Sequence, residues 1–163
     1  MFAAGTTAAA EGGTTLNAFD NALLAGGIGN INLVKMSSIM PPAVRVIPMP
    51  RIRRGALIPT AYAAVSSSVP GETIAAAIGW GLPEDIEEAG VIMEAHGVFD
   101  VKDAVRAIER MLDEAFQVRG TRMRERKILA IEHRVERAGC AIAAVTLLSP
   151  ADLDTDKRVV VTG

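Results

Sequence analysis

Hydrophobic positions along the chain follow two different periods, and each period predicts a type of element. The clearest pattern is helical and runs from residue 101 to residue 119, with apolar side chains at Val101, Ala104, Val105, Ile108, Met111, Leu112, Ala115 and Phe116. Asp100 is a suitable N-cap with Asp103 three residues later, and Gly120 suits the C-terminal end. The pattern predicts an amphipathic helix that lies on a sheet.

A shorter helix is expected between residues 15 and 25, with Thr14 or Thr15 as its N-cap and the Gly26-Gly27 pair at its end. Residues four apart share one side of a helix, so Leu16, Asp20 and Leu24 form one row. This row places a carboxylate close to the apolar face, where an unpaired charge is costly.

Alternating and β-branched stretches predict a series of strands, several of them interrupted by prolines. They span residues 31–36, 44–50, 55–67, 89–97, 127–137 and 139–148, and the last two suggest a hairpin. Residues 71–83 fit a buried strand or a short buried helix equally well, because periodicity does not separate the two. The small residues of 1–13 suggest a loose arm, with a tied-down first strand as the alternative, and the polar residues of 150–163 suggest a loose tail. We expect one α+β domain over residues 1–163.

Composition limits the class of protein. Seventeen basic and nineteen acidic residues give a formal charge of −2, and half of the chain is hydrophobic, so neither a disordered chain nor a nucleic-acid-binding protein is expected. No apolar run approaches the roughly 18 residues of a membrane span. The single cysteine, Cys140, lies in an apolar stretch and suits a buried position in a reducing compartment. We therefore expect a cytoplasmic protein without a membrane partner.

Three familiar kinds of site are not supported. The stretch GGIGNIN lacks the third glycine of a dinucleotide fingerprint, since position 32 is asparagine, and a strand follows where a helix is required. His96 and His133 have no metal-ligand spacing, so no metal is predicted. No G-x-S-x-G motif supports a serine hydrolase.

A serine pair in the stretch KMSSIMPP, residues 35–42, remains to be explained. The pair belongs to the first of four stretches that follow one another in this order: LNAFDNALLAGGIGNINLVKMSSIMPP, GALIPTAYAAVSSSVPGETIAAAI, GVIMEAHG and IEHRVERAGCAIAA. In these stretches the chain resembles the pyruvoyl-dependent arginine decarboxylase family. The resemblance covers about residues 16–148. It implies a layered αββα-type sandwich, a homotrimer or a dimer of trimers, and decarboxylation of L-arginine to agmatine.

For the serine pair, the resemblance implies self-cleavage between Ser37 and Ser38, into residues 1–37 and 38–163, with conversion of Ser38 into a pyruvoyl group. The Ser38 hydroxyl would attack the preceding carbonyl, and elimination of the resulting ester needs the β-oxygen that serine provides. Such a reaction requires a distorted peptide held by the surrounding fold, and we expect a strand that ends at Ser38 to provide it. A pyruvoyl group acts as an electron sink, so no separate cofactor is needed.

Three further residues match family positions. The resemblance implies that Glu94 is the proton donor, and the apolar residues before it favour a protonated carboxyl group. It implies that Asp20 binds the substrate guanidinium, for which a carboxylate offers two parallel hydrogen bonds. Asn32 is a candidate donor to the oxyanion during cleavage. Six residues of straight strand span about 20 Å, so Asn32 reaches Ser38 either if the chain doubles back or if the site is shared between subunits. We adopt the second option, since the resemblance implies trimers with sites at the subunit boundary.

The residues leave two alternatives open. Nothing in the sequence fixes the length of the substrate, so a pyruvoyl enzyme for another amino acid is possible. A non-catalytic oligomeric scaffold, in which Ser37 and Ser38 are turn residues that are never cleaved, is the second.

Overall fold

The structure, a computed structural model, describes residues 1–154. The described part contains, in chain order, β1 (Phe2–Glu11), α1 (Thr15–Ala25), β2 (Asn32–Lys35), β3 (Ile39–Met40), β4 (Arg45–Ile47), β5 (Leu57–Ser67), β6 (Thr73–Pro83), β7 (Gly90–Gly97), α2 (Val101–Arg119), β8 (Met123–Arg134), β9 (Gly139–Leu148) and a 3-10 turn at Pro150–Asp152. Within this part, no helix is long and apolar enough to cross a membrane.

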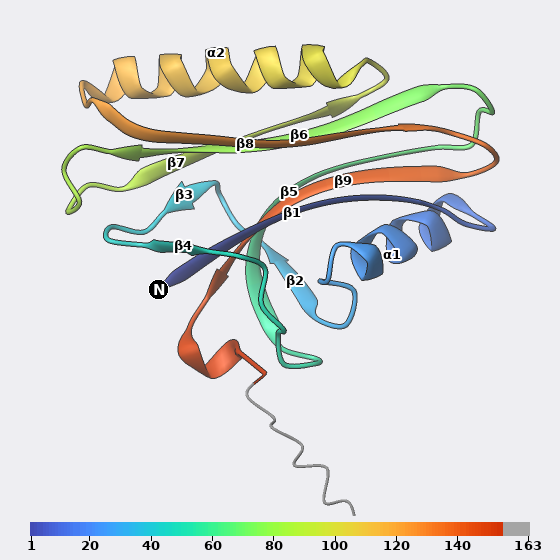
Figure 1. Cartoon of the computed structure of the whole chain (residues 1–163), viewed down its shortest axis with the longest axis horizontal. Helices are drawn as coiled ribbons and strands as arrows, with labels where there is room; N and C mark the ends of the chain where they lie inside the picture. Colours follow the sequence, from blue (N-terminus) through green and yellow to red (C-terminus); the bar gives the residue numbers. More distant parts are fainter. Residues whose placement is uncertain (155–163) are drawn as a thin grey trace, which may run out of the picture.

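These elements form four layers (Figure 1). A sheet with the order β2-β5-β9-β1-β4 packs against a second sheet with the order β3-β7-β6-β8. Helix α1 covers the outer face of the first sheet and α2 covers the outer face of the second (Figure 1). The predicted α+β class and the layered αββα arrangement are confirmed.

The predicted loose arm at residues 1–13 is wrong for most of its length. Residues 2–11 form β1, which pairs with β9 from Phe2 opposite Leu148 to Glu11 opposite Gly139. The segment is rich in alanine, which has little preference for strands, but its partners on both sides override this weak local preference. Of the predicted loose tail, residues 150–152 form the 3-10 turn, and residues 155–163 lie outside the described part.

Both predicted helices are present with the expected ends. Thr14 caps α1 by accepting a hydrogen bond from the Asn17 amide, and Asp100 caps α2 by accepting one from the Asp103 amide. Gly120 ends α2 in the left-handed conformation that favours glycine. Helix α2 lies close to β6 because Gly79 is opposite Ile108, where a Cβ atom would come within 2.4 Å of the isoleucine side chain.

The pattern of residues 71–83 fitted either a strand or a helix. In the structure, this segment contains the strand β6. Every one of its residues from Ile74 to Pro83 is buried, because α2 covers one face of the strand and the other sheet covers the opposite face. Burial on both faces produces a continuous apolar run rather than an alternation. Small side chains such as Ala61 and Ala143 face large ones such as Trp80 in the core between the sheets.

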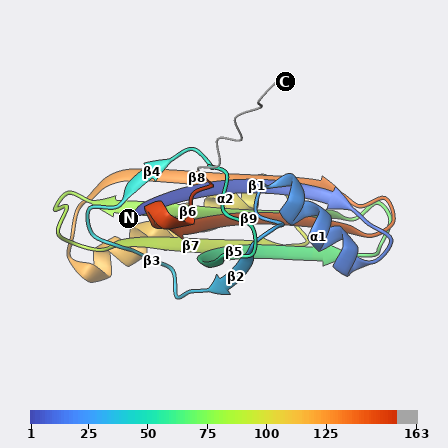
Figure 2. The same cartoon turned by 90° about the horizontal axis from the view of Figure 1, so that it is seen from below.

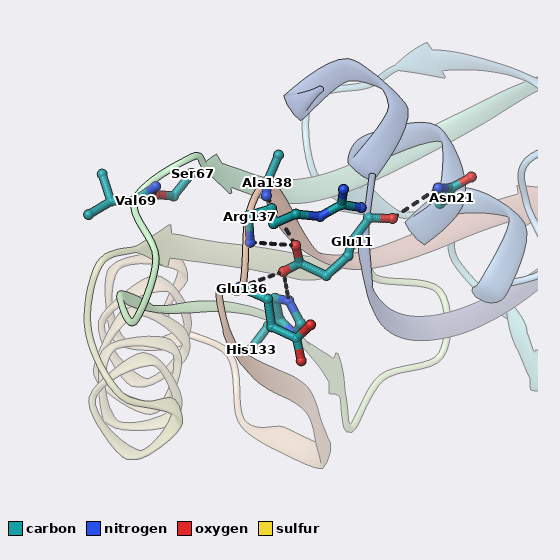
Figure 3. Close-up of polar contacts among 8 residues, drawn as sticks. All are labelled: Glu11, Asn21, Ser67, Val69, His133, Glu136, Arg137 and Ala138. Atoms are coloured by element: carbon teal, nitrogen blue, oxygen red, sulfur yellow. Dashed lines mark hydrogen bonds and ion pairs between the residues drawn. The ribbon is translucent and has the colours of Figure 1, made fainter. Parts of the chain in front are cut away.

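A carboxylate fastens the β8–β9 turn to the end of β1 (Figure 3). Glu11 Oε1 accepts a hydrogen bond from the Glu136 amide at 3.0 Å and lies 2.6 Å from His133 Nε2, while Oε2 accepts from the Arg137 and Ala138 amides at 3.0 Å each. These bonds, led by that from the Glu136 amide and followed by His133, lower the pKa of Glu11 from 4.5 to about 2.

Candidate active site

The serine pair lies where the chain crosses from one sheet to the other. Strand β2 is an edge strand of the first sheet and β3 is an edge strand of the second, so residues 36–38 connect the two layers. Figure 2 shows β2 and β3 along the same side of the molecule. The expected strand ending at Ser38 is wrong: β2 ends at Lys35 and the next strand begins at Ile39. A crossing segment has neighbours from both sheets that constrain its backbone.

The backbone at Ser38 is in an unusual conformation. Its φ angle is +33°, in a region that residues with a side chain rarely adopt. Such a conformation costs on the order of 1–3 kcal/mol and persists only when neighbouring contacts hold it. Here the Ile92 amide donates to the Ser38 carbonyl oxygen at 2.8 Å, and Ile39 pairs with Val91 in the next register position. The edge of the second sheet thus holds the strained residue.

A half-open cavity of about 350 Å³ adjoins the serine pair. Strand β7 forms one wall and the C-terminal end of α2 contributes a cation. The lining residues are Ser37, Ser38, Ile39, Val91, Ile92, Met93, Glu94 and Arg119. A cavity of this size, lined by apolar side chains together with two serines, a carboxyl group and a guanidinium, is suited to a small amino-acid ligand.

Glu94 is the carboxyl group of this cavity. It lies on β7 opposite Ile78 of β6, with about a quarter of its side chain exposed. Its Oε1 is 3.7 Å from Lys35 Nζ, whereas Oε2 is buried and has no hydrogen-bond partner among the described residues. A buried oxygen without a partner is costly, so this oxygen is available to accept a hydrogen bond from a bound ligand. A second hollow, of about 530 Å³, lies between β7 and α2 and also reaches Glu94.

Sequence reasoning missed two cations at this site. Lys35 lies 5.0 Å above the Tyr62 ring and beside Glu94, and Arg119 lines the cavity from α2. Lys35 belonged to the quoted stretch KMSSIMPP, so its position next to the serines was a usable signal. Arg119 is remote in sequence, and only the packing of α2 on the sheet brings it to the cavity.

Two predicted site residues lie elsewhere in the protomer. The side chain of Asn32, at the start of β2, donates to the Gly55 carbonyl oxygen at 3.1 Å. Asp20 is exposed on α1, on the outer face of the other sheet. Among the described residues, neither lines the cavity at Ser38. Within one chain the structure therefore brings together Ser37, Ser38 and Glu94, and the roles of Asn32 and Asp20 remain predictions.

A solved structure has a similar fold. A solved structure of pyruvoyl-dependent histidine decarboxylase superposes with a TM-score of 0.50 at 16% identity, covering 61% of this chain and 54% of that chain. The protein therefore has the fold of a pyruvoyl-dependent decarboxylase.

The sequence comparisons are more specific. Residues 1–151 match the family model described as pyruvoyl-dependent arginine decarboxylase. A protein of that name from Methanocaldococcus jannaschii is 48% identical over 137 residues, 84% of this chain and 83% of that protein. Another from Pyrococcus abyssi is 46% identical over 143 residues, 86% of this chain and 90% of that protein. The chain belongs to the pyruvoyl-dependent arginine decarboxylase family.

Family membership confirms the predicted family, enzyme class and pyruvoyl cofactor. The residues at the serine pair fit such a group: Ser38 carries the β-oxygen, has a strained backbone and adjoins a cavity with an unpartnered carboxyl oxygen. Formation of the group from Ser38 remains a prediction.

Proposed function

We propose that this protein cleaves itself between Ser37 and Ser38 and then decarboxylates L-arginine to agmatine and carbon dioxide. The observation that carries the proposal is the left-handed backbone of Ser38, held beside a cavity that also contains Glu94. A strained, over-constrained residue of this kind is typical of a functional site. The family supports the choice of arginine.

Self-cleavage proceeds through the two serines. The Ser38 hydroxyl oxygen bonds to the Ser37 carbonyl carbon, and the Ser37–Ser38 C–N bond breaks, which leaves an ester and a free amine. Loss of the Ser38 α-proton expels the ester oxygen, so Ser37 leaves as a carboxylate and residue 38 becomes dehydroalanine. Water then replaces its nitrogen, releasing ammonia. Asn32 is proposed to donate to the oxyanion of the first step, from a neighbouring subunit.

Once formed, the pyruvoyl group supplies an electron sink for loss of carbon dioxide from the bound amino acid. The chain positions the reacting residue through the Ile92 amide, because the Ser38 carbonyl that this amide holds belongs to the peptide bond with Ile39 and survives cleavage. Glu94 is proposed to deliver the proton that replaces the carboxylate on the substrate α-carbon.

We further propose a homotrimer, or a dimer of trimers, with the site shared between subunits. Leu16 and Leu24, on either side of Asp20, are 74% and 47% exposed, and Leu57 is 71% exposed. Exposed leucines in a row favour an interface. A neighbouring subunit that covers them would bring Asp20 to a Ser38 cavity, where its carboxylate would bind the substrate guanidinium. A cytoplasmic location is also proposed, supported by the free, buried Cys140.

Intact mass tests the cleavage. Purified protein is expected to contain residues 1–37 and a fragment 38–163 with a pyruvoyl N-terminus. Ser38→Ala is expected to give one uncut chain, while Ser37→Ala, which retains the attacking hydroxyl, is the matched control and is expected to be cut. A folded, aged parent protein that remains a single chain would support the non-catalytic scaffold instead.

Substrate identity needs a separate assay. Steady-state rates on arginine, lysine, ornithine and histidine are expected to favour arginine strongly, because a planar guanidinium makes two parallel bonds to a carboxylate and an ammonium does not. Equal efficiency on another amino acid would support a pyruvoyl enzyme of different specificity.

A further inference from the structure

Arg119 is a cation of the Ser38 cavity to which the proposed chemistry assigns no role. It is the last residue of α2, and its Nη1 donates to the Ala115 carbonyl oxygen at 3.0 Å. None of the ion pairs among the described residues includes Arg119. The other cation near the site, Lys35, already faces Glu94. The guanidinium therefore has donors available for an anion.

Self-cleavage creates an anion at this place. Ser37, which lines the same cavity as Arg119, acquires a permanent carboxylate when its carbonyl carbon is released from Ser38. The chain before it is anchored only as far as Met36: β2 ends at Lys35, and the last backbone hydrogen bond of this side in the described part runs from the Met36 amide to the Thr60 carbonyl oxygen at 3.2 Å. A new chain end beyond its last anchor frays unless another contact holds it.

We propose that Arg119 binds the new Ser37 carboxylate in the cleaved enzyme and fixes the end of fragment 1–37 against the cavity wall. This inference rests on the proposed self-cleavage, because the uncut chain has no such carboxylate. Arginine suits the role better than lysine, since its planar fork of N–H groups matches the two oxygens of a carboxylate. Arg119 is therefore a positioning residue.

The carboxylate of the substrate is the competing partner, and the chemistry disfavours it. Loss of carbon dioxide disperses the negative charge of that carboxylate, so a cation paired with it stabilises the bound substrate more than the transition state. An arginine without a partner beside the reacting serine would oppose decarboxylation in this way. Pairing with Ser37 neutralises Arg119 and leaves the substrate carboxylate free to depart.

Carboxypeptidase trimming of the native, cleaved enzyme tests the contact. Arg119→Gln removes the charge, Arg119→Lys retains it without the fork, and Arg122→Gln is a matched control because Arg122 follows α2 and does not line the cavity. Loss of Ser37 from fragment 1–37 is followed by intact mass. We expect trimming about two- to fivefold faster in Arg119→Gln than in the parent, intermediate trimming in Arg119→Lys, and no change in Arg122→Gln.

A measurement on the unmodified enzyme supports the proposal independently of any variant. One molar salt weakens exposed ion pairs. Salt also affects the carboxypeptidase itself, so the trimming rate of the parent is divided by the trimming rate of a free peptide of residues 30–37 in the same salt. We expect this ratio to rise in one molar salt. If Arg119→Gln is not cleaved at all, this salt experiment decides.

Four results would overturn the inference. A cleaved Arg119→Gln enzyme trimmed at the parent rate refutes it alone, as does parent trimming that salt leaves unchanged. The third result is a raised KM for arginine in Arg119→Gln while inhibition by agmatine is unchanged. Because agmatine lacks a carboxylate, this result would assign Arg119 to the carboxylate of the substrate instead. A parent protein that is never cleaved would refute both the self-cleavage and this contact, so the two failures are distinguishable.

Discussion

Replacing Glu11 with glutamine is expected to destabilise the protein although the side chain keeps its size. One carboxylate oxygen accepts from the Arg137 and Ala138 amides, and the other accepts from the Glu136 amide and contacts His133. The NH₂ group of a glutamine must replace one of these oxygens. At the position of Oε2, the NH₂ group leaves the Arg137 and Ala138 amides facing another donor; at the position of Oε1, it leaves the Glu136 amide facing one.

The size of the effect follows from these contacts. A hydrogen bond to a charged group contributes about 1.5–3 kcal/mol, so one or two lost bonds cost about 1.5–6 kcal/mol. About a quarter of the Glu11 side chain is exposed, and water replaces part of the loss, so we expect about 3 kcal/mol. For a chain of this length, that loss lowers Tm by about 6–12 °C.

Thermal unfolding in the Ser38→Ala background is the assay, because a covalently whole chain does not separate into fragments on heating. Glu136→Gln is the matched control: it removes one negative charge from the same turn without touching the carboxylate that the turn surrounds (Figure 3). A Tm for Glu11→Gln within about 2 °C of this control would refute the reasoning.

The same comparison has a predicted pH dependence. Because folding lowers the pKa of Glu11 from 4.5 to about 2, its contribution to stability is fully present above about pH 4.5 and is lost as the pH falls toward 2. The Tm difference between Glu11→Gln and its control is therefore expected to be constant from pH 7 to 5 and to shrink below that. A difference that stays the same at pH 3 would mean that the lowered pKa is not the cause.

Three further outcomes concern the active site. Glu94→Gln is expected to be cleaved normally and to decarboxylate arginine about 10²- to 10⁴-fold more slowly, as measured by carbon dioxide release, because an amide of the same shape does not supply the proton; activity within twofold of the parent would assign the proton to another group. Asp20→Asn is expected to lose about a hundredfold or more in kcat/KM for arginine while cleavage proceeds, since the guanidinium loses its charged partner; unchanged kcat/KM would make Asp20 a surface residue only. Mixed oligomers of Ser38→Ala and Asp20→Asn subunits are expected to regain activity that neither variant has alone, and a mixture without such recovery would place the site within one chain.

Much of the fold was predictable because local signals and tertiary contacts agree. The 3.6-residue period of α2, the Asp100 cap and the Gly120 end specify that helix, and the structure reproduces its bounds. Local preference and tertiary contacts disagree at β1. Its alanines have little preference for strands, and the strand forms because β9 pairs with it along its whole length. Local preference also fails to identify β6, because burial on both faces removes the alternation that distinguishes a strand.

The site was predictable in its residue types but not in its geometry. The pair Ser37-Ser38 and the carboxyl of Glu94 are visible in the sequence, and the structure brings them to one cavity. That Ser38 has a positive φ angle depends on a chain that leaves one sheet and joins the other within three residues. Sequence carries no signal for such strain, since serine is common in unstrained turns.

The position of the strain explains how a stable fold contains a peptide bond that is proposed to break. Residues 36–38 are fixed at both ends, by the Met36 amide on β5 and by the Ser38 carbonyl on β7, so relaxing the Ser38 backbone would require one sheet to release its edge strand. Cleavage between Ser37 and Ser38 divides the connection without removing either anchor. The strain is then relieved while both sheets keep their pairing, and fragment 1–37 stays bound because β1 retains its full register with β9. The proposed cleavage thus falls at a bond whose loss leaves the pairing of both sheets in place.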